Sequence, residues 1–231
     1  GDLNTSVRDE LIADYAPIVG TWISPAEWLS IGFAFHGESA AEFTFPITAD
    51  LGPAFPIDLP QLNVSGVAQY DPLQLSLESS FSFASGWLVS TGVAYKRWSR
   101  FENPIENTTE AMPAQDPPLF RDIYVPRIGA ELHQQLERVE LAYRLGGFYE
   151  PTPVPEQTGN NNYLDSDRIG FGLGTGIVWE GIHFDWALSA QFMRERRHTK
   201  DPDSVRDPEN SGLPFIDHGG VIVSSSFEVG V

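Results

Sequence analysis

Residues 182 to 192 alternate between apolar and polar side chains. The even positions from Ile182 to Phe192 are all apolar, whereas the odd positions include His183 and Asp185. Because successive side chains of a β-strand point to opposite faces of its sheet, this period of two predicts a strand with one apolar and one polar face. A soluble sandwich buries such an apolar face in its core, whereas a membrane barrel exposes it to lipid and keeps polar groups inside.

The composition narrows the possible functions. The chain has 231 residues, of which 41% are hydrophobic, an ordinary proportion for a folded protein. Its 14 basic and 32 acidic residues give a formal net charge of −18, so we expect no nucleic-acid partner. Cysteine is absent, which excludes disulfides and thiolate metal sites. No apolar run approaches about 18 residues, so a helical membrane span is excluded while a membrane barrel is not.

Sustained alternation predicts nine strands. They cover about residues 18–23, 27–48, 61–83, 87–99, 122–133, 138–150, 167–179, 182–196 and 219–231. Segment 27–48 keeps one parity throughout, which predicts a single long strand. In segment 61–83 the apolar parity changes, which predicts a bulge or bend at Asp71–Pro72.

The connections between these strands alternate in length. The short ones are 24–26, 84–86, 133–137 and 180–181, and the long ones are roughly 49–60, 101–121, 151–166 and 197–218. This pattern is typical of an up-and-down barrel with short periplasmic turns and long extracellular loops. Under this topology the last strand runs inward and Val231 lies on the periplasmic side.

The polar faces of the predicted strands carry charges of both signs next to glycines. The residues expected to face the lumen and to contact a ligand are Arg127, Glu131, Glu140, Arg144, Gly172, Gly174, His183 and Asp185. Two interpretations are open. The charges are structural ion pairs that fill a narrow lumen, with glycines accommodating neighbouring side chains, or they form a polar wall beside a ligand passage.

Several sequence blocks resemble one known family. They are YRLGGFYEPTPVP at 143–155, NYLDSDR at 162–168, the glycine-rich strand 170–176, WSRF at 98–101, PRIG at 126–129, and 18–37 with its PAEW turn. Together they are similar to the C-terminal part of the FadL family of outer-membrane transporters for long-chain fatty acids and other hydrophobic compounds. The resemblance implies an all-β fold, an antiparallel up-and-down transmembrane β-barrel in the outer membrane of a Gram-negative bacterium.

The resemblance also implies that residues 1–231 are one barrel domain lacking its N-terminal part. The nine predicted strands match the last nine of the roughly fourteen in the family, so the plug and the first strands are absent. Nine antiparallel strands leave two unpaired edges, so either the sequence is partial, which we favour, or another chain completes the wall. The N-terminus also lacks the features of a signal peptide, so we expect that a signal was removed or that the start is missing.

Enzyme and metal functions have weak sequence support. The five histidines are scattered, and no catalytic or phosphate-binding motif is present. His183 and Asp185 share a strand face, but a solvated pair explains them better than acid–base or metal chemistry. The acidic cluster Asp201, Asp203, Asp207 and Glu209 does not fit a calcium loop and suits a solvated loop. We expect no catalysis, no cofactor and no bound metal.

The resemblance favours passive uptake of hydrophobic small molecules such as long-chain fatty acids. Two alternatives are a structural barrel subunit of a multi-protein envelope or secretion assembly, and a soluble β-sandwich binding module. The expected partners are a hydrophobic ligand and outer-membrane lipid with lipopolysaccharide and, under the assembly alternative, other envelope proteins.

Overall fold

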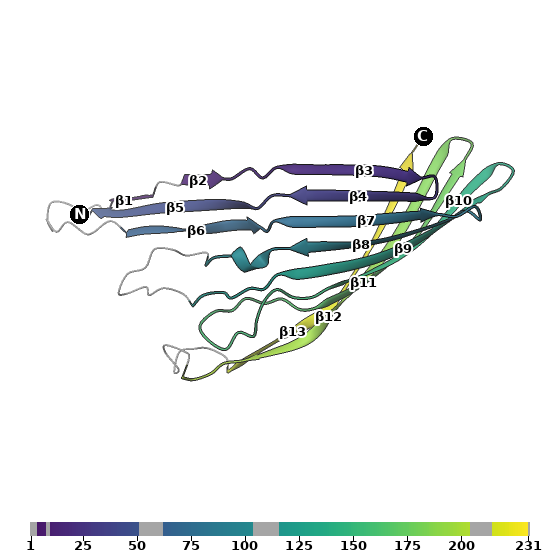
Figure 1. Cartoon of the computed structure of the whole chain (residues 1–231). Coiled ribbons are helices and arrows are strands. Elements are labelled where there is room, and N and C mark those ends of the chain that lie inside the picture. Colours follow the sequence, from purple (N-terminus) through teal and green to yellow (C-terminus); the bar gives the residue numbers. More distant parts are fainter. Residues whose placement is uncertain (1–3, 8–9, 51–61, 104–115, 204–213, 231) are drawn as a thin grey trace.

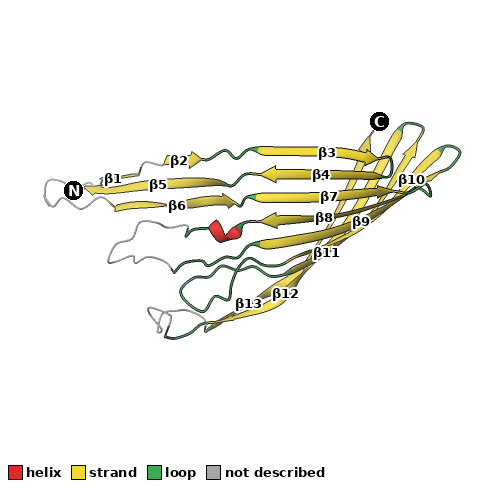
Figure 2. Cartoon of the chain, in the orientation of Figure 1, coloured by secondary structure: helices red, strands yellow, loops and turns green. Residues whose placement is uncertain are grey.

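The protein is almost entirely β-structure. A computed structural model describes residues 4–7, 10–50, 62–103, 116–203 and 214–230. The strands are β1 (Asn4–Val7), β2 (Glu10–Ala13), β3 (Ile18–Ala26), β4 (Leu29–His36), β5 (Ser39–Asp50), β6 (Leu62–Asp71), β7 (Gln74–Ser82), β8 (Trp87–Lys96), β9 (Ile123–Gln135), β10 (Val139–Glu150), β11 (Arg168–Trp179), β12 (Ile182–Thr199) and β13 (Phe215–Gly230). A 3₁₀ turn, Trp98–Arg100, follows β8 (Figure 2). Among the described residues, no helix is long and apolar enough to cross a membrane.

Nine strands form one antiparallel sheet. Their order is β13-β12-β11-β10-β9-β8-β7-β4-β3, so every strand lies beside its sequence neighbour within the sheet. A second, four-stranded sheet joins β5 to β1, β2 and β6. Figure 1 shows that β5 and β6 continue the lines of β4 and β7 and do not cover their faces. The architecture is therefore one curved layer, and its edge strands β3 and β13 are not paired with each other in the described part of the chain.

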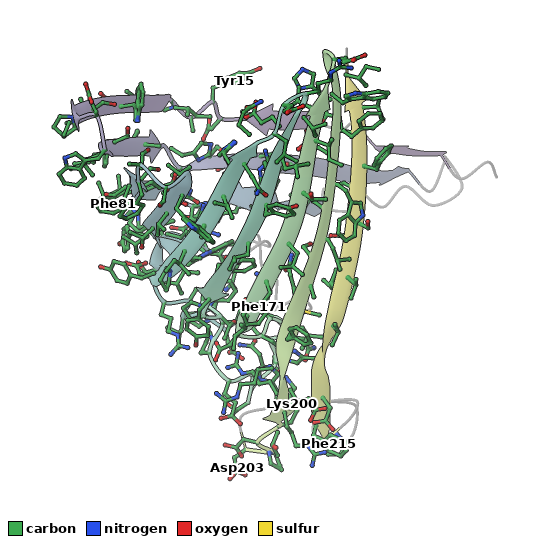
Figure 3. All side chains as sticks on the ribbon, turned by 90° about the vertical axis from the view of Figure 1, so that its right-hand side faces the viewer. Tyr15, Phe81, Phe171, Lys200, Asp203 and Phe215 are labelled. Carbon is green, nitrogen blue, oxygen red and sulfur yellow. The ribbon has the colours of Figure 1, made fainter. Side chains whose placement is uncertain are left out.

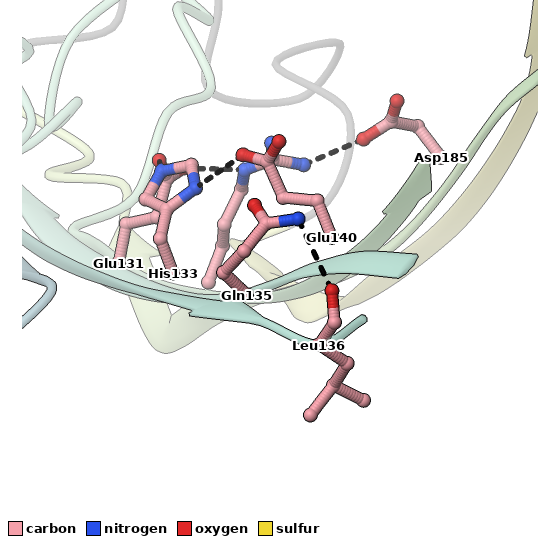
Figure 4. A network of polar contacts seen from close by, with 7 residues as sticks. Glu131, His133, Gln135, Leu136, Glu140 and Asp185 are labelled. Atoms are coloured by element: carbon pink, nitrogen blue, oxygen red, sulfur yellow. Dashed lines mark hydrogen bonds and ion pairs between the residues drawn. The ribbon is translucent and has the colours of Figure 1, made fainter. Parts of the chain in front are cut away.

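The two faces of the curved sheet differ as the alternation predicts. Large apolar side chains on one face remain exposed, such as Ile128 at 63% and Phe171 at 58%. The charged residues project from the concave face, and Figure 4 shows Leu136 pointing to the opposite side. The accessible surface is 15791 Å², compared with about 10,000 Å² for a compact soluble monomer of this mass. The apolar face is not buried in a core, which excludes the β-sandwich alternative.

The prediction of one long strand over 27–48 is wrong. The strand is divided at Gly37, whose backbone N–H donates to the carbonyl oxygen of Pro17 at 2.9 Å. A side chain at position 37 would lie 2.8 Å from the Pro17 ring, so this close approach needs glycine. The pairing partners also change here, because β4 pairs with β3 and β7, whereas β5 pairs with β1, β2 and β6. The predicted interruption at Asp71–Pro72 is confirmed, since β6 ends at Asp71 and β7 begins at Gln74.

The short turns all lie at one end of the sheet and the long connections at the other (Figure 1). Two predicted turn positions are shifted. The first turn is at residues 27–28, because Pro25 lies in edge strand β3, where its missing N–H is tolerated beside a register shift between Ile23 and Ala26. The third is at residues 136–138, because β9 continues to Gln135.

The remaining differences concern strand ends. The turn between β11 and β12 is at the predicted position and has positive φ at Glu180 and Gly181, which matches the twist of a two-residue hairpin. Strand β12 extends to Thr199 and β13 begins at Phe215, so the last long connection is shorter than predicted. The short strands β1 and β2 were not predicted.

Candidate functional site

A network of charged side chains crosses the concave face near the short-turn end (Figure 4). Arg144 on β10 donates through Nε to Glu131 on β9 and through Nη1 to Asp185 on β12, the latter at 2.6 Å. His133 bonds to Glu131 through Nε2 and lies 3.3 Å from Glu140 through Nδ1. Each of these side chains is partly exposed, so the pairs are solvated and individually weak.

Glycine in β11 allows this network to bridge three strands. Arg144 and Asp185 are on strands that flank β11, and Gly176 is the register partner of Asp185. A Cβ at position 176 would lie 2.8 Å from Asp185 Oδ1 and 3.2 Å from Arg144 Nη1. Because glycine has no side chain, the ion pair passes directly over the strand.

The other glycines on this face have different roles. A Cβ at position 170 would lie 2.1 Å from the ring of Phe148, so Gly170 accommodates that ring. A Cβ at position 174 would contact Arg144 at an ordinary 3.5 Å. At position 172 it would meet only the Leu188 carbonyl oxygen, at 4.0 Å. Gly172 therefore faces open space on the concave side.

This open space is a hollow of about 450 Å³. It is bordered by Lys96, Val125, Arg127, Gly146, Gly147, Phe148, Glu150, Gly172 and Ser189, and by Phe171, whose side chain has the parity of the opposite, apolar face. Phe148 also packs against the small buried cluster of Ala94, Ile123 and Val125. The size lies in the range of pockets that hold small molecules, and an aromatic ring beside bare glycine backbone offers an apolar contact surface.

The charges that line the hollow are paired. Lys96 Nζ lies 2.6 Å from Glu150 Oε1, and Arg127 lies 3.6 Å from Glu78. Arg168 Nη2 approaches the second oxygen of Glu150 at 3.7 Å. Glu150 therefore lies between two cations at the edge of the hollow, and its side chain is only 16% exposed.

Seven of the eight predicted lumen residues divide into two groups. Arg127 and Gly172 line the hollow, whereas Glu131, Glu140, Arg144, Gly174 and Asp185 form or underlie the charge network. His183 is exposed near the turn, and Asp185 bonds to Arg144 rather than to this histidine.

Sequence reasoning missed Lys96, Phe148, Glu150 and Ser189 as lining residues. Their parity in the predicted strands was a usable signal, because each falls on the same face as Arg127 or Arg144. What the parity did not give was the register that brings them together.

The long-loop end is held by buried polar contacts. His198 on β12 is fully buried, accepts a bond from the Gln157 amide at Nδ1 (2.9 Å) and lies 2.9 Å from His218 Nε2. Ser166 Oγ lies 2.8 Å from His218 Nδ1. Burial lowers the pKa of both histidines, and the nearby Arg196 guanidinium lowers it further. These bonds fix residues 151–167 against β12 and β13, beyond the last lipid-facing aromatic of β12, Phe192.

Aromatic rings from strand β6 and from two loops gather at the same end. Tyr70, Trp98, Phe101, Phe120 and Tyr163 contact one another with centroid distances of 4.7 to 6.4 Å. Figure 3 places Lys200, Asp203 and Phe215 at this end and Phe171 further along the strands.

The acidic cluster shows no metal-binding geometry in the part that is described. Asp201 Oδ1 accepts a bond from the Asp203 amide at 3.0 Å, so it caps its own turn. Asp207 and Glu209 lie outside the described residues. Within the described ranges, no group of three His, Cys, Asp or Glu side chains could hold a metal ion.

Comparison with known proteins agrees with this architecture. Residues 12–226 match the family model described as outer membrane protein transport protein (OMPP1/FadL/TodX). Alkane uptake protein A of Marinobacter nauticus is 26% identical over 152 residues, covering 60% of this chain and 32% of that protein.

Two solved structures share the fold. A FadL homologue of Pseudomonas aeruginosa superposes with a TM-score of 0.64 at 19% identity, over 92% of this chain and 50% of that one. The CymD monoaromatic hydrocarbon channel superposes with a TM-score of 0.55 at 15% identity, over 93% of this chain and 50% of that one. The chain therefore spans about half the length of these structures and a third of the curated relative.

Proposed function

Because this chain belongs to the OMPP1/FadL/TodX family of outer-membrane transport proteins, we propose that it forms part of the wall of a channel for the passive uptake of hydrophobic small molecules. The family is one of transport channels rather than of enzymes, and its members lie in the outer membrane of Gram-negative bacteria. The exposed apolar face of the sheet suits contact with lipid at that location.

The observation that carries the proposal is the hollow over Gly172. It lies on the concave, lumen-facing side, and the ring of Phe148 supplies an apolar contact there. An aromatic ring beside bare glycine backbone offers an apolar ligand contact area within an otherwise polar lumen. The ion pairs beside the hollow hold its charged side chains against the wall.

The names of the relatives support an apolar ligand. The curated relative is an alkane uptake protein, and one structural relative is a monoaromatic hydrocarbon channel. Alkanes and monoaromatic hydrocarbons are therefore candidate substrates, beside the long-chain fatty acids that the sequence resemblance implies.

The proposal is tested by filling the hollow. In the full-length protein, Gly172→Trp adds an indole to the open space and is expected to slow uptake of an alkane by intact cells about tenfold. Thr175→Trp is the matched control, because position 175 belongs to the opposite parity and carries the same bulk toward lipid. Normal uptake by Gly172→Trp cells with a normal amount of barrel in the outer membrane would contradict the proposal.

The same pair of variants addresses the alternative role as a structural subunit of an envelope or secretion assembly. A structural subunit would not transport the alkane, so cells with the wild type, with either variant or without the protein would take it up at the same rate. A role in transport requires faster uptake by wild-type cells than by cells lacking the protein, and a loss of most of this difference in Gly172→Trp cells.

A further inference from the structure

We propose that the hollow selects neutral apolar molecules over carboxylates. Glu150 is the specificity-determining residue, because its carboxylate pairs with the ammonium group of Lys96 and so keeps that cation from a ligand. The inference rests on the proposed function and narrows its substrate class from hydrophobic compounds in general to uncharged ones. Glu150 thus acts on selectivity through Lys96 and not through a contact of its own with the ligand.

Lys96 and Glu150 form a short ion pair that is largely shielded from solvent. Nζ and Oε1 are 2.6 Å apart, and the two side chains are 23% and 16% exposed. A charge-assisted bond at this distance and burial is far stronger than a solvated surface pair. A ligand carboxylate that sought Lys96 would have to displace Glu150, whose second oxygen also faces Arg168 at 3.7 Å.

The charges around the hollow are balanced, because each cation in its lining faces a carboxylate. Its lining contributes two cations, Lys96 and Arg127, and each lies within 4.0 Å of a carboxylate, Glu150 and Glu78 respectively. Arg168, just outside the lining, is shared between Glu150 and Asp165. A fatty-acid carboxylate entering this site would lose water and meet cations that already face a carboxylate, which is costly for an ion.

An apolar contact surface remains for a neutral ligand. Phe148 and the bare backbone of Gly146 and Gly172 present surface that needs no partner charge. The chain as a whole carries a formal charge of −18, which further disfavours the approach of anions. The size of the hollow does not distinguish an alkane from the fatty acid of the same chain length, because the two differ little in volume.

The experiment compares a neutral and an ionised ligand of equal chain length. The full-length protein, held in amphipol at pH 7.5, binds the neutral fluorescent probe N-phenyl-1-naphthylamine, and decane and decanoate compete for it. At this pH decanoate is ionised. For the wild type, decane is expected to displace the probe at a concentration at least tenfold lower than decanoate.

Glu150→Gln provides the decisive variant. It keeps the side-chain shape but frees the ammonium group of Lys96, so the affinity for decanoate is expected to rise about tenfold while that for decane stays within twofold. The double variant Lys96→Met with Glu150→Gln should lose the gain for decanoate and keep decane binding. Glu180→Gln is the charge-matched control, because Glu180 lies in the exposed turn between β11 and β12.

The possible outcomes separate this inference from the proposed function. Equal displacement by decane and decanoate in the wild type, or no gain for decanoate in Glu150→Gln, would overturn the selectivity and leave uptake of hydrophobic compounds standing. Failure of the wild type to bind the probe or either ligand would overturn both.

Discussion

At the scale of single residues, the glycines of β11 show how one repeated residue type serves several purposes. The sequence predicted that these glycines share the lumen face, and it left open whether they make room for neighbours or for a ligand. Gly170 and Gly176 make room for neighbours, namely a ring and an ion pair, whereas Gly172 faces the hollow. The distinction depends on which side chains of β10 and β12 lie opposite each glycine, and the alternation pattern does not contain that information.

The role of Gly176 is testable by adding one methyl group. Gly176→Ala places a Cβ 2.8 Å from Asp185 Oδ1, so the Arg144–Asp185 bond must lengthen. Because both side chains are partly exposed, we expect a loss of only about 1 kcal/mol in the free energy of unfolding. Gly172→Ala adds the same methyl group to open space and should be within about 0.5 kcal/mol of the wild type. Urea titration of the detergent-solubilised barrel measures both, and equal stability of the two variants would count against this role.

The buried histidine pair predicts a response to acid. Since Gln157 donates to His198 Nδ1, the proton of His198 is on Nε2 and is donated to His218, whose own proton then faces Ser166. A second proton on either ring would place two donors face to face. The charged groups around the pair are Arg196 and Lys200 from β12 and its end, Glu156 and Asp165 from the loop, and Asp217 from β13.

The sign of the effect follows from the lowered pKa values. With the loop detached, the two histidines bind a proton near pH 6.5, whereas the hydrogen-bonded pair does so only at lower pH. The anchoring is therefore complete above about pH 6.5 and is lost as the pH falls through the lowered pKa values. The Gln157 amide, with its exchange corrected for the intrinsic rate, should therefore be protected from hydrogen exchange at pH 7.5 and lose protection progressively as the pH is lowered below about 6.5. Equal protection throughout the acid titration would refute this hydrogen-bond chain, and His133→Gln should leave the response unchanged.

At the scale of strands, the sequence predicted the regular part of the sheet closely. The predictions 138–150 and 167–179 differ by one residue from Val139–Glu150 and Arg168–Trp179, because strict alternation ends where a turn begins. The division of 27–48 was missed since the apolar parity continues across Gly37. The contact that interrupts the strand comes from Pro17, which lies outside segment 27–48 and does not affect its alternation.

The orientation of β12 is tested by two adjacent substitutions. Leu188→Arg directs a charge toward lipid near the middle of the strand and should cost roughly 2 to 4 kcal/mol. Ala187→Arg directs the same side chain into the lumen, where Ala187 is exposed, and should cost less than about 1 kcal/mol. The fraction of folded barrel, read from heat-modifiable gel mobility, compares the two. Similar losses from both would contradict the assignment of faces.

At the scale of the whole molecule, the charged pairs and the hollow are properties of the curved sheet rather than of any one strand. Strand order and the positions of long and short connections could be predicted, because both follow from an up-and-down meander. The hollow could not, since it depends on the register of β8 to β12 and on the curvature that turns Lys96 and Glu150 toward each other. Sequence parity assigns a face but not a neighbour.

The central claim is that the concave face of the sheet lines a passage that hydrophobic ligands enter. Because this chain contains no cysteine, single substitutions can be placed cleanly along β11, in a full-length protein without other cysteines. The most direct measurement is the rate at which a water-soluble methanethiosulfonate reagent modifies Phe171→Cys, Gly172→Cys, Leu173→Cys and Gly174→Cys, with and without decane. We predict fast modification at 172 and 174, slow modification at 171 and 173, and protection by decane at 172. Modification without alternation, or no protection at 172, would contradict the account.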